Sequence, residues 1–145
     1  MIFIASDHAG VDLKDKVEKY LTKCELEFID LGTNSTVSVD YPFYAKLLAE
    51  NVLKNENAIG ILICGTGIGM SIAVNRFSKI RGALCRTAKN AYFARRHNNA
   101  NVLVLGGRDK LTQFGYKKIV KTFLSTQFEG GRHQRRIDLI DSQEK

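Results

Sequence analysis

A reactive thiol and a glycine-rich loop stand next to each other near the middle of the sequence. An apolar run over residues 59–63 ends in Cys64, and glycines then occupy alternate positions, at Gly65, Gly67 and Gly69. The apolar run predicts a buried parallel strand, and the residues after the glycines predict the first turn of a helix. Glycines let the backbone turn sharply and approach a ligand with its N–H groups pointing outward. Such a loop suits an anion, either a bound phosphate or an oxyanion formed during a reaction.

The loop matches neither of two common nucleotide-binding motifs. A P-loop ends in Gly-Lys-Ser/Thr, whereas Gly69 is followed by Met70 and Ser71. The dinucleotide fingerprint needs a third glycine where Met70 stands and an acidic residue after the next strand, where Arg86 stands. We therefore disfavour a nucleotide and favour an enzyme with a thiol beside an anion site. A tight connection without a ligand remains the alternative for the loop, and a small buried apolar residue is the alternative for Cys64.

Other polar residues that could take part in the chemistry follow the first predicted strand or belong to the loop. Asp7 and His8 come directly after the apolar run 1–6. Asp7 could instead cap the next helix, and His8 could be ordinary polar surface. Thr66 and Ser71 could cap the helix after the loop or bind an oxyanion with their hydroxyl groups.

Basic residues late in the chain are a second group of candidates. His97 ends a predicted helix, directly after Arg95 and Arg96. A histidine there can serve the helix dipole alone, or in a pocket it can take or give a proton near neutral pH. Arg132 and Arg136 lie four residues apart and share a helical face. They could hold a phosphate with forked donors, or they could belong to a solvated tail.

The composition limits the class of protein. The chain has 145 residues, of which 44% are hydrophobic and 26% are charged, as expected for one globular domain with its own core. No apolar run is long enough to span a membrane, and the N-terminus lacks a secretory pattern. The three cysteines, Cys24, Cys64 and Cys85, are widely spaced and include no CxxC pair. They predict free thiols in a reducing compartment, expected to be the cytoplasm, and argue against a zinc site.

The net charge of +7 arises from 22 basic and 15 acidic residues. The positive charges are spread along the chain and are not interleaved with aromatic residues, so nucleic-acid binding is disfavoured. A small phosphorylated substrate explains the charge equally well, and so does a solvated surface that happens to be basic.

Five short apolar runs predict strands, at residues 1–6, 27–31, 59–64, 82–85 and 102–105. Apolar residues at helical spacing follow each run, and a last helix is predicted over residues 132–140. Asp40 is expected to cap the helix that begins near Pro42 and buries Leu53. Tyr92 is expected to face inward from the helix that Thr87 caps.

Strands that alternate with helices predict an α/β fold with a single three-layer domain over residues 1–145. Its core is a Rossmann-like, five-stranded parallel sheet, and a C-terminal helix starts at about residue 130. Right-handed crossovers bring the carboxyl ends of all strands to one edge of the sheet. That edge is expected to gather residues 7–8, the loop after Cys64, the residues after Cys85 and residues 106–108, where ligands bind in such sheets.

Several motifs occur together in the order typical of one family. They are Asp7-His8, Asp40-Tyr41-Pro42, Cys64-Gly-Thr-Gly-Ile-Gly-Met-Ser71, His97-Asn98, Gly107-Arg108 and Gly130-Gly-Arg-His-Gln-Arg-Arg136. Over essentially its whole length the chain resembles the type B ribose-5-phosphate isomerases, a family that also contains galactose-6-phosphate and allose-6-phosphate isomerases. The resemblance implies an aldose–ketose isomerase that interconverts ribose 5-phosphate and ribulose 5-phosphate through an enediolate, with no cofactor and no metal.

The resemblance also assigns roles to residues of the site. Cys64 would be the base that moves a proton between C1 and C2, because Met70 stands where some members have a glutamate base. His97 would help to open the sugar ring. The enediolate oxygen would be held by Thr66 and by the amides of Gly65, Gly67, Gly69, Met70 and Ser71. The sugar hydroxyls would be oriented by Asp7, Tyr41 and Asn98, and the phosphate would be held by His8, Arg132 and Arg136, with Arg108 as a further contact.

Members of the family are dimers or dimers of dimers, so the resemblance implies a homodimer or homotetramer with sites shared between subunits. We expect His97, Asn98 and Arg108 to reach across an interface. The alternatives are an isomerase of allose 6-phosphate or galactose 6-phosphate and a non-catalytic sugar-phosphate sensor. A nucleic-acid-binding module is the weakest alternative.

Overall fold

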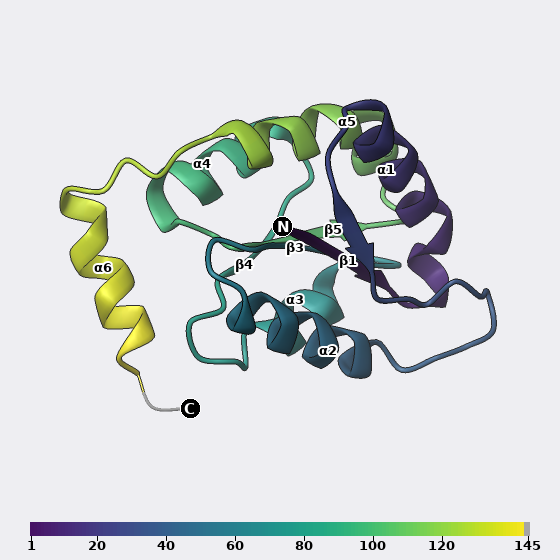
Figure 1. Ribbon diagram of the computed structural model, residues 1–145, viewed down its shortest axis with the longest axis horizontal. Helices are drawn as coiled ribbons and strands as arrows, with labels where there is room; N and C mark the ends of the chain where they lie inside the picture. Colours follow the sequence, from purple (N-terminus) through teal and green to yellow (C-terminus); the bar gives the residue numbers. More distant parts are fainter. Residues whose placement is uncertain (144–145) are drawn as a thin grey trace.

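A five-stranded parallel sheet lies between two layers of helices in the computed structural model, which describes residues 1–143 (Figure 1). The strand order is β2-β1-β3-β5-β4. The strands are β1 (Ile2–Ser6), β2 (Phe28–Asp30), β3 (Ile59–Cys64), β4 (Gly82–Leu84) and β5 (Val102–Gly106). The α/β class and the five parallel strands agree with the prediction, and the strand ends differ from it by a few residues.

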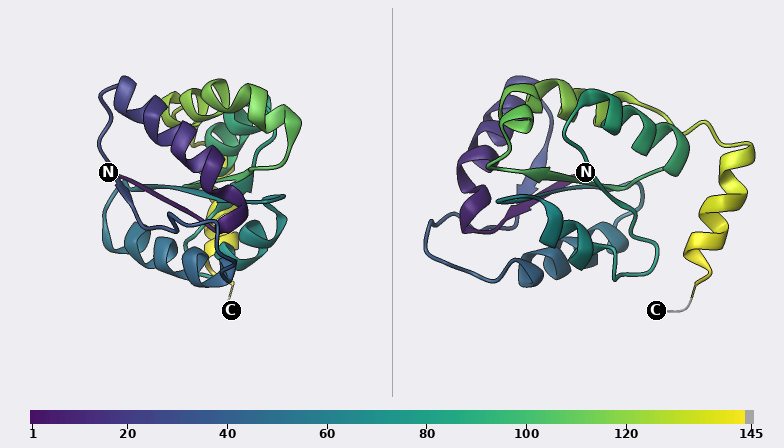
Figure 2. Two further views of the ribbon diagram at one scale, coloured as in Figure 1. Left: turned by 90° about the vertical axis from the view of Figure 1, so that its right-hand side faces the viewer. Right: turned by 180° about the vertical axis from the view of Figure 1, so that it is seen from behind.

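Two helical layers cover the faces of the sheet, as the views in Figures 1 and 2 show together. One layer contains α1 (Val11–Lys23), α4 (Ala88–Asn98) and α5 (Lys110–Ser125), and the other contains α2 (Tyr41–Lys54) and α3 (Ile68–Val74). A short 3-10 helix, His8–Gly10, precedes α1. No helix among the described residues is long and apolar enough to cross a membrane.

Alternate residues of each strand pack into two separate hydrophobic cores, one on each face of the sheet. In β3, Ile61 and Ile63 pack with α1, α4 and α5, whereas Leu62 and Cys64 pack with α2 and α3. This alternation follows from the period of two in a strand, and both faces are apolar because helices cover both. Cys64 therefore leaves the sheet on the side of α2 and α3.

Because the strands are parallel, they all begin at one end of the sheet, the amino edge, and all finish at the other end, the carboxyl edge. Ser6 pairs with Ile63 and Cys64 pairs with Gly106, so β1, β3 and β5 finish together at one edge. At the other edge, Val102 lies opposite both Gly60 and Gly82. Loops after the strands therefore meet at the carboxyl edge, and loops that follow the helices meet at the amino edge.

Three local expectations were wrong. Asp40 holds the position before α2, but its side chain makes no capping hydrogen bond. Leu53 is 45% exposed, whereas the buried face of that helix consists of Ala45, Leu48, Ala49 and Val52. Tyr92 is 40% exposed, because the smaller Ala91 and Ala94 face the core from α4. Thr87 does cap α4, since its side chain accepts a hydrogen bond from the Asn90 amide.

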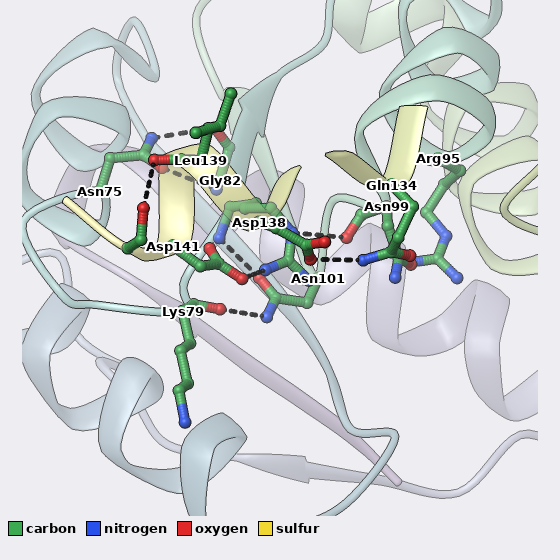
Figure 3. A network of polar contacts seen from close by, with 12 residues as sticks. Asn75, Lys79, Gly82, Arg95, Asn99, Asn101, Gln134, Asp138, Leu139 and Asp141 are labelled. Atoms are coloured by element: carbon green, nitrogen blue, oxygen red, sulfur yellow. Dashed lines mark hydrogen bonds and ion pairs between the residues drawn. The ribbon is translucent and has the colours of Figure 1, made fainter. Parts of the chain in front are cut away.

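The last helix, α6 (Arg132–Asp141), stands at one end of the molecule beyond α4 (Figures 1 and 2). A polar network ties its end to the amino edge of the sheet (Figure 3). Arg81 Nη1 lies 2.7 Å from Asp141 Oδ2, and the same guanidinium donates from Nε to the Asn99 carbonyl. The Arg81 amide donates to Asn101 Oδ1. These bonds hold α6 against the loops that precede β4 and β5.

A buried lysine joins the first helix to the end of β2. The Lys14 side chain is fully buried, and its Nζ lies 2.7 Å from Asp30 Oδ1 and 3.4 Å from Glu18 Oε1. It also donates to Asn34 Oδ1, in the loop that leads toward α2. Burial alone would raise the pKa of Asp30, but hydrogen bonds from Lys14 and the Gly32 amide and the charge of Lys14 together lower it.

This ion pair predicts an acid-sensitive contribution to stability. Replacing Asp30 with Asn leaves the buried ammonium without its nearest countercharge, so the free energy of unfolding at neutral pH should fall by roughly 2–3 kcal/mol. Because the folded-state pKa of Asp30 is lowered, its contribution is complete above the ordinary value of 3.8 and disappears as the pH falls through the lower folded value. Urea unfolding at several pH values measures this.

The control is Asp15→Asn, an exposed position on α1, which should change stability by no more than about 0.5 kcal/mol. An Asp30→Asn protein as stable as the wild type at neutral pH would contradict the role given to the ion pair.

Candidate active site

Cys64 ends β3 at the carboxyl edge and is held by the backbone around it. The Gly67 amide donates to its sulfur at 3.2 Å. The Cys64 carbonyl accepts from the Gly107 amide at 2.7 Å, and the Gly65 carbonyl accepts from the Arg108 amide at 2.9 Å. The thiol is thus nearly buried, in contact with a backbone donor, and fixed between the loops that follow β3 and β5.

The glycine loop has a backbone that other residues would not adopt. Gly67 has a φ of 78°, and a Cβ built there would lie 2.4 Å from Leu84 Cδ1 and 3.1 Å from the Leu105 carbonyl carbon. The amides of Gly69 and Met70 lie in the first turn of α3, where no earlier helical carbonyl can accept from them. Met70 contributes only backbone here, because its side chain is buried in the core.

Other residues predicted for the site lie around this loop. The Tyr41 ring packs over Gly69, where an added Cβ would lie 2.6 Å from Tyr41 Cζ. The guanidinium of Arg108 lies beside Gly65 of its own chain, 3.5 Å from the place of a Cβ. Arg108 therefore joins the loop without crossing an interface, in contrast to the expectation. Thr66 Oγ1 accepts from the amide of Ile68, the first residue of α3, although Gly67 and not Thr66 holds the capping position.

The residues after β1 are fixed by their own hydrogen bonds. Asp7 Oδ1 accepts from the amides of Ala9 and Gly10, so the alternative role of Asp7 as a helix cap is realised. His8 Nδ1 accepts from the Val39 amide at 3.2 Å, which places the proton of the neutral imidazole on Nε2. His8 is therefore a fixed donor at this edge.

Not every predicted residue lies at the carboxyl edge. His97 and Asn98 end α4, which runs back from the carboxyl edge, so they lie near the amino edge of the sheet before β5. Arg132 and Arg136 are on α6, which is attached to that same edge. Since β5 has five residues, the two edges are about 17 Å apart. One chain therefore does not bring His97 next to Cys64.

Two residues that the sequence analysis missed surround His97. Glu129 Oε2 lies 3.8 Å from His97 Nε2 and 3.4 Å from His133 Nε2. The imidazole rings of His97 and His133 are stacked, with centroids 4.3 Å apart and planes inclined by 15°. His133 stands within the motif Gly130-Gly-Arg-His-Gln-Arg-Arg136, but Glu129 precedes α6 and its contact with His97 left no signal in the sequence.

Comparison with known proteins places the fold in a family. The model of the family described as Ribose/Galactose Isomerase matches residues 2–140. A structure of a ribose 5-phosphate isomerase from Thermotoga maritima is 55% identical, with a TM-score of 0.94, covering 98% of this chain and 97% of that chain. A ribose-5-phosphate isomerase B from Mycoplasma genitalium, solved with bound ribulose-5-phosphate, is 47% identical, with a TM-score of 0.91 and coverage of 97% and 93%. A putative sugar phosphate isomerase of Rickettsia bellii is 51% identical over 142 residues, covering 97% of this chain and 96% of the relative.

The chain therefore belongs to the ribose/galactose isomerase family. Within that family it is similar over nearly its full length to ribose 5-phosphate isomerases, as the motifs predicted.

The backbone conformation of Gly67 leads to a prediction about stability. Gly67→Ala should lower the free energy of unfolding by about 1–3 kcal/mol, because it strains a left-handed residue and drives a methyl group into Leu84. Gly65→Ala is the matched control, since its added Cβ meets only ordinary contacts at 3.5 Å or more. Urea denaturation compares the two, and equal stabilities would contradict the strain assigned to Gly67.

Proposed function

We propose that this protein is an aldose–ketose isomerase that interconverts D-ribose 5-phosphate and D-ribulose 5-phosphate. The observation that carries the proposal is a nearly buried thiol, Cys64, held by an amide in a glycine loop, in a chain of this family. The similar protein of Mycoplasma genitalium binds ribulose-5-phosphate, the product of the proposed reaction. The amides of the loop suit the oxyanion that the reaction creates.

In this mechanism Cys64 acts as the base on the open-chain sugar. It removes the proton from C2, the electrons of the C2–H bond form a C1=C2 bond, and the aldehyde oxygen takes the negative charge. The amides around Gly69 and Met70 and the Thr66 hydroxyl stabilise that charge. The same thiol then returns the proton to C1, where the C1=C2 electrons form the new C1–H bond. The C2 hydroxyl loses its proton as the C2 carbonyl forms, O1 gains a proton, and the ketose results. No cofactor or metal has a step in this scheme.

The other thiols are poor candidates for the base. Burial raises the pKa of Cys85 to about 12, so this thiol stays protonated at neutral pH. Cys24 is exposed and follows α1, at the amino edge of the sheet.

The remaining predicted residues bind the substrate in this proposal. His8, Arg132 and Arg136 hold the phosphate, with Arg108 as a further contact. Asp7, Tyr41 and Asn98 orient the sugar hydroxyls, and His97 opens the furanose ring. Because His97, Asn98 and the arginines of α6 lie at the far edge of the sheet, the complete site combines the loop of one chain with these residues from another.

A second copy is thus part of the proposal, as a homodimer or homotetramer with shared sites. Exposed apolar side chains support it: Phe43 on α2 and Ile68 and Ile72 on α3 are between 55% and 65% exposed. Apolar groups gathered in this way are typical of surfaces that pack against a partner. We further propose that the chain acts as a single domain in the cytoplasm, which suits its free thiols.

A six-carbon substrate is the second candidate and is not favoured. The similar structures from Thermotoga maritima and Mycoplasma genitalium are both of ribose 5-phosphate isomerases. Comparison of kcat/KM for ribose 5-phosphate, allose 6-phosphate and galactose 6-phosphate decides between the candidates.

Removal of the proposed base gives the main kinetic prediction. Cys64→Ala should reduce kcat on ribose 5-phosphate by about 10²–10⁴-fold, because a positioned base contributes that much to the rate, while substrate binding persists. Coupled assays give kcat, and calorimetry gives the affinity for ribose 5-phosphate. The control Cys24→Ala, an exposed thiol, should keep full activity. Turnover by Cys64→Ala at the wild-type rate would show that another residue is the base.

A further inference from the structure

Three side chains meet where α4 ends and α6 begins. His97 comes from α4, Glu129 from the connection before α6, and His133 from the first turn of α6. Glu129 and His133 have no part in the mechanism described so far. His133 is 8% exposed, and its Nε2 has no hydrogen-bond partner among the described residues, although Glu129 Oε2 lies 3.4 Å away.

Glu129 is held in place by a residue next to His97. Its amide donates to the Arg96 carbonyl at 3.0 Å, and its Oε1 lies 3.6 Å from Arg96 Nη2. The backbone and one carboxylate oxygen are thus fixed by the same arginine. The other oxygen, Oε2, is left facing both imidazole rings, at 3.8 Å from His97 and 3.4 Å from His133.

The plane of the His97 ring is set by two aromatic neighbours. His133 stacks on it with centroids 4.3 Å apart, and Phe93, one turn earlier in α4, lies 4.9 Å away at an inclination of 45°. These contacts leave the imidazole few orientations, although about a third of its side chain is exposed. A ring held in this way is preorganised to meet a substrate.

A metal ion is the other occupant that two histidines and a carboxylate suggest. A metal lies close to the plane of each imidazole that binds it. The rings of His97 and His133 are stacked face to face with nearly parallel planes. One ion therefore cannot lie in both ring planes unless one ring turns. The geometry therefore favours contact between the side chains over a metal centre.

We propose that Glu129 and His133 are positioning residues that hold His97 for opening of the furanose ring. The proposal rests on the proposed function, in which His97 has that role. In ring opening the C1–O4 bond breaks, O4 gains a proton, and the anomeric hydroxyl loses one as the aldehyde forms. Glu129 faces the imidazole that handles these protons, with its Oε2 3.8 Å from His97 Nε2.

The charges around His133 fit a neutral partner in the stack. Burial lowers the pKa of His133, and the positive charges of His97, Arg132 and Arg136 lower it further, whereas Glu129 opposes them. A neutral His133 places no second positive charge against His97.

Two measurements separate ring opening from proton transfer. Ring opening interconverts the α and β anomers of ribose 5-phosphate. Magnetisation-transfer NMR follows this interconversion separately from isomerisation. Ribulose 5-phosphate cannot close a furanose ring, because its O5 carries the phosphate. Exchange of its C1 proton with D2O therefore reports the Cys64 step alone.

The variant is Glu129→Gln in the full-length assembled protein. We expect it to slow enzyme-dependent anomer interconversion about 10–100-fold, the cost of a misplaced catalytic group, and to change the C1 exchange rate by less than about twofold. Glu129→Asp, which keeps the charge, should recover part of the loss. His133→Phe, which keeps a ring against His97, should retain more ring opening than His133→Ala.

Glu50→Gln is the matched control, because Glu50 on α2 has the same 43% side-chain exposure as Glu129 and also faces a cation, Lys46. It should change neither rate. Normal anomer interconversion by Glu129→Gln would overturn the proposal, as would an equal loss of both rates. Ring opening that is lost with a chelator and restored by Zn²⁺ would replace it with a metal site. Absence of C1 exchange by the wild-type protein would instead remove the proposed function itself.

Discussion

Close packing of backbone on backbone at the carboxyl edge of the sheet is the constraint on which the site depends. The Asp7 amide donates to the Ile63 carbonyl, and the Gly107 amide donates to the Cys64 carbonyl, so the loops after β1, β3 and β5 are joined directly. The approach is close enough that a Cβ on Gly10 would lie 2.5 Å from the Ile63 carbonyl oxygen. The thiol, the loop amides and the Arg108 guanidinium are positioned by these contacts, because strands and their hydrogen bonds move less than isolated loops.

The same parallel topology that joins Cys64 to the glycine loop places His97, the other main residue of the proposed site, at the opposite edge of the sheet. Each helix returns the chain to the amino edge, so the end of α4 lies about the length of a strand away from Cys64. The His97 ring is nevertheless held in place, by stacking on His133 and by the nearby carboxylate of Glu129. Two preorganised half-sites at opposite edges are the geometry expected where one copy completes the site of another.

Much of this architecture could be predicted from the sequence, because buried strands and glycine turns leave strong local patterns. The run before Cys64 and the glycines after it indicated a strand, a sharp turn and a helix, and the structure contains all three. Local patterns failed where packing decides. Leu53 and Tyr92 are apolar, but smaller residues of the same helices occupy the core. The contacts of Glu129 and His133 with His97 depend on how α6 docks, which residue spacing does not encode.

The most direct test of a site shared between two copies combines two inactive variants. Cys64→Ala and His97→Asn should each lack isomerase activity, since each loses one half of every site. Co-expressed with different tags and purified as mixed oligomers, they form one site that contains both intact residues and one that contains neither, if sites combine two chains. We predict that isomerisation of ribose 5-phosphate returns to about half of the wild-type rate per mixed dimer. Mixed oligomers as inactive as either variant would contradict a site shared between copies.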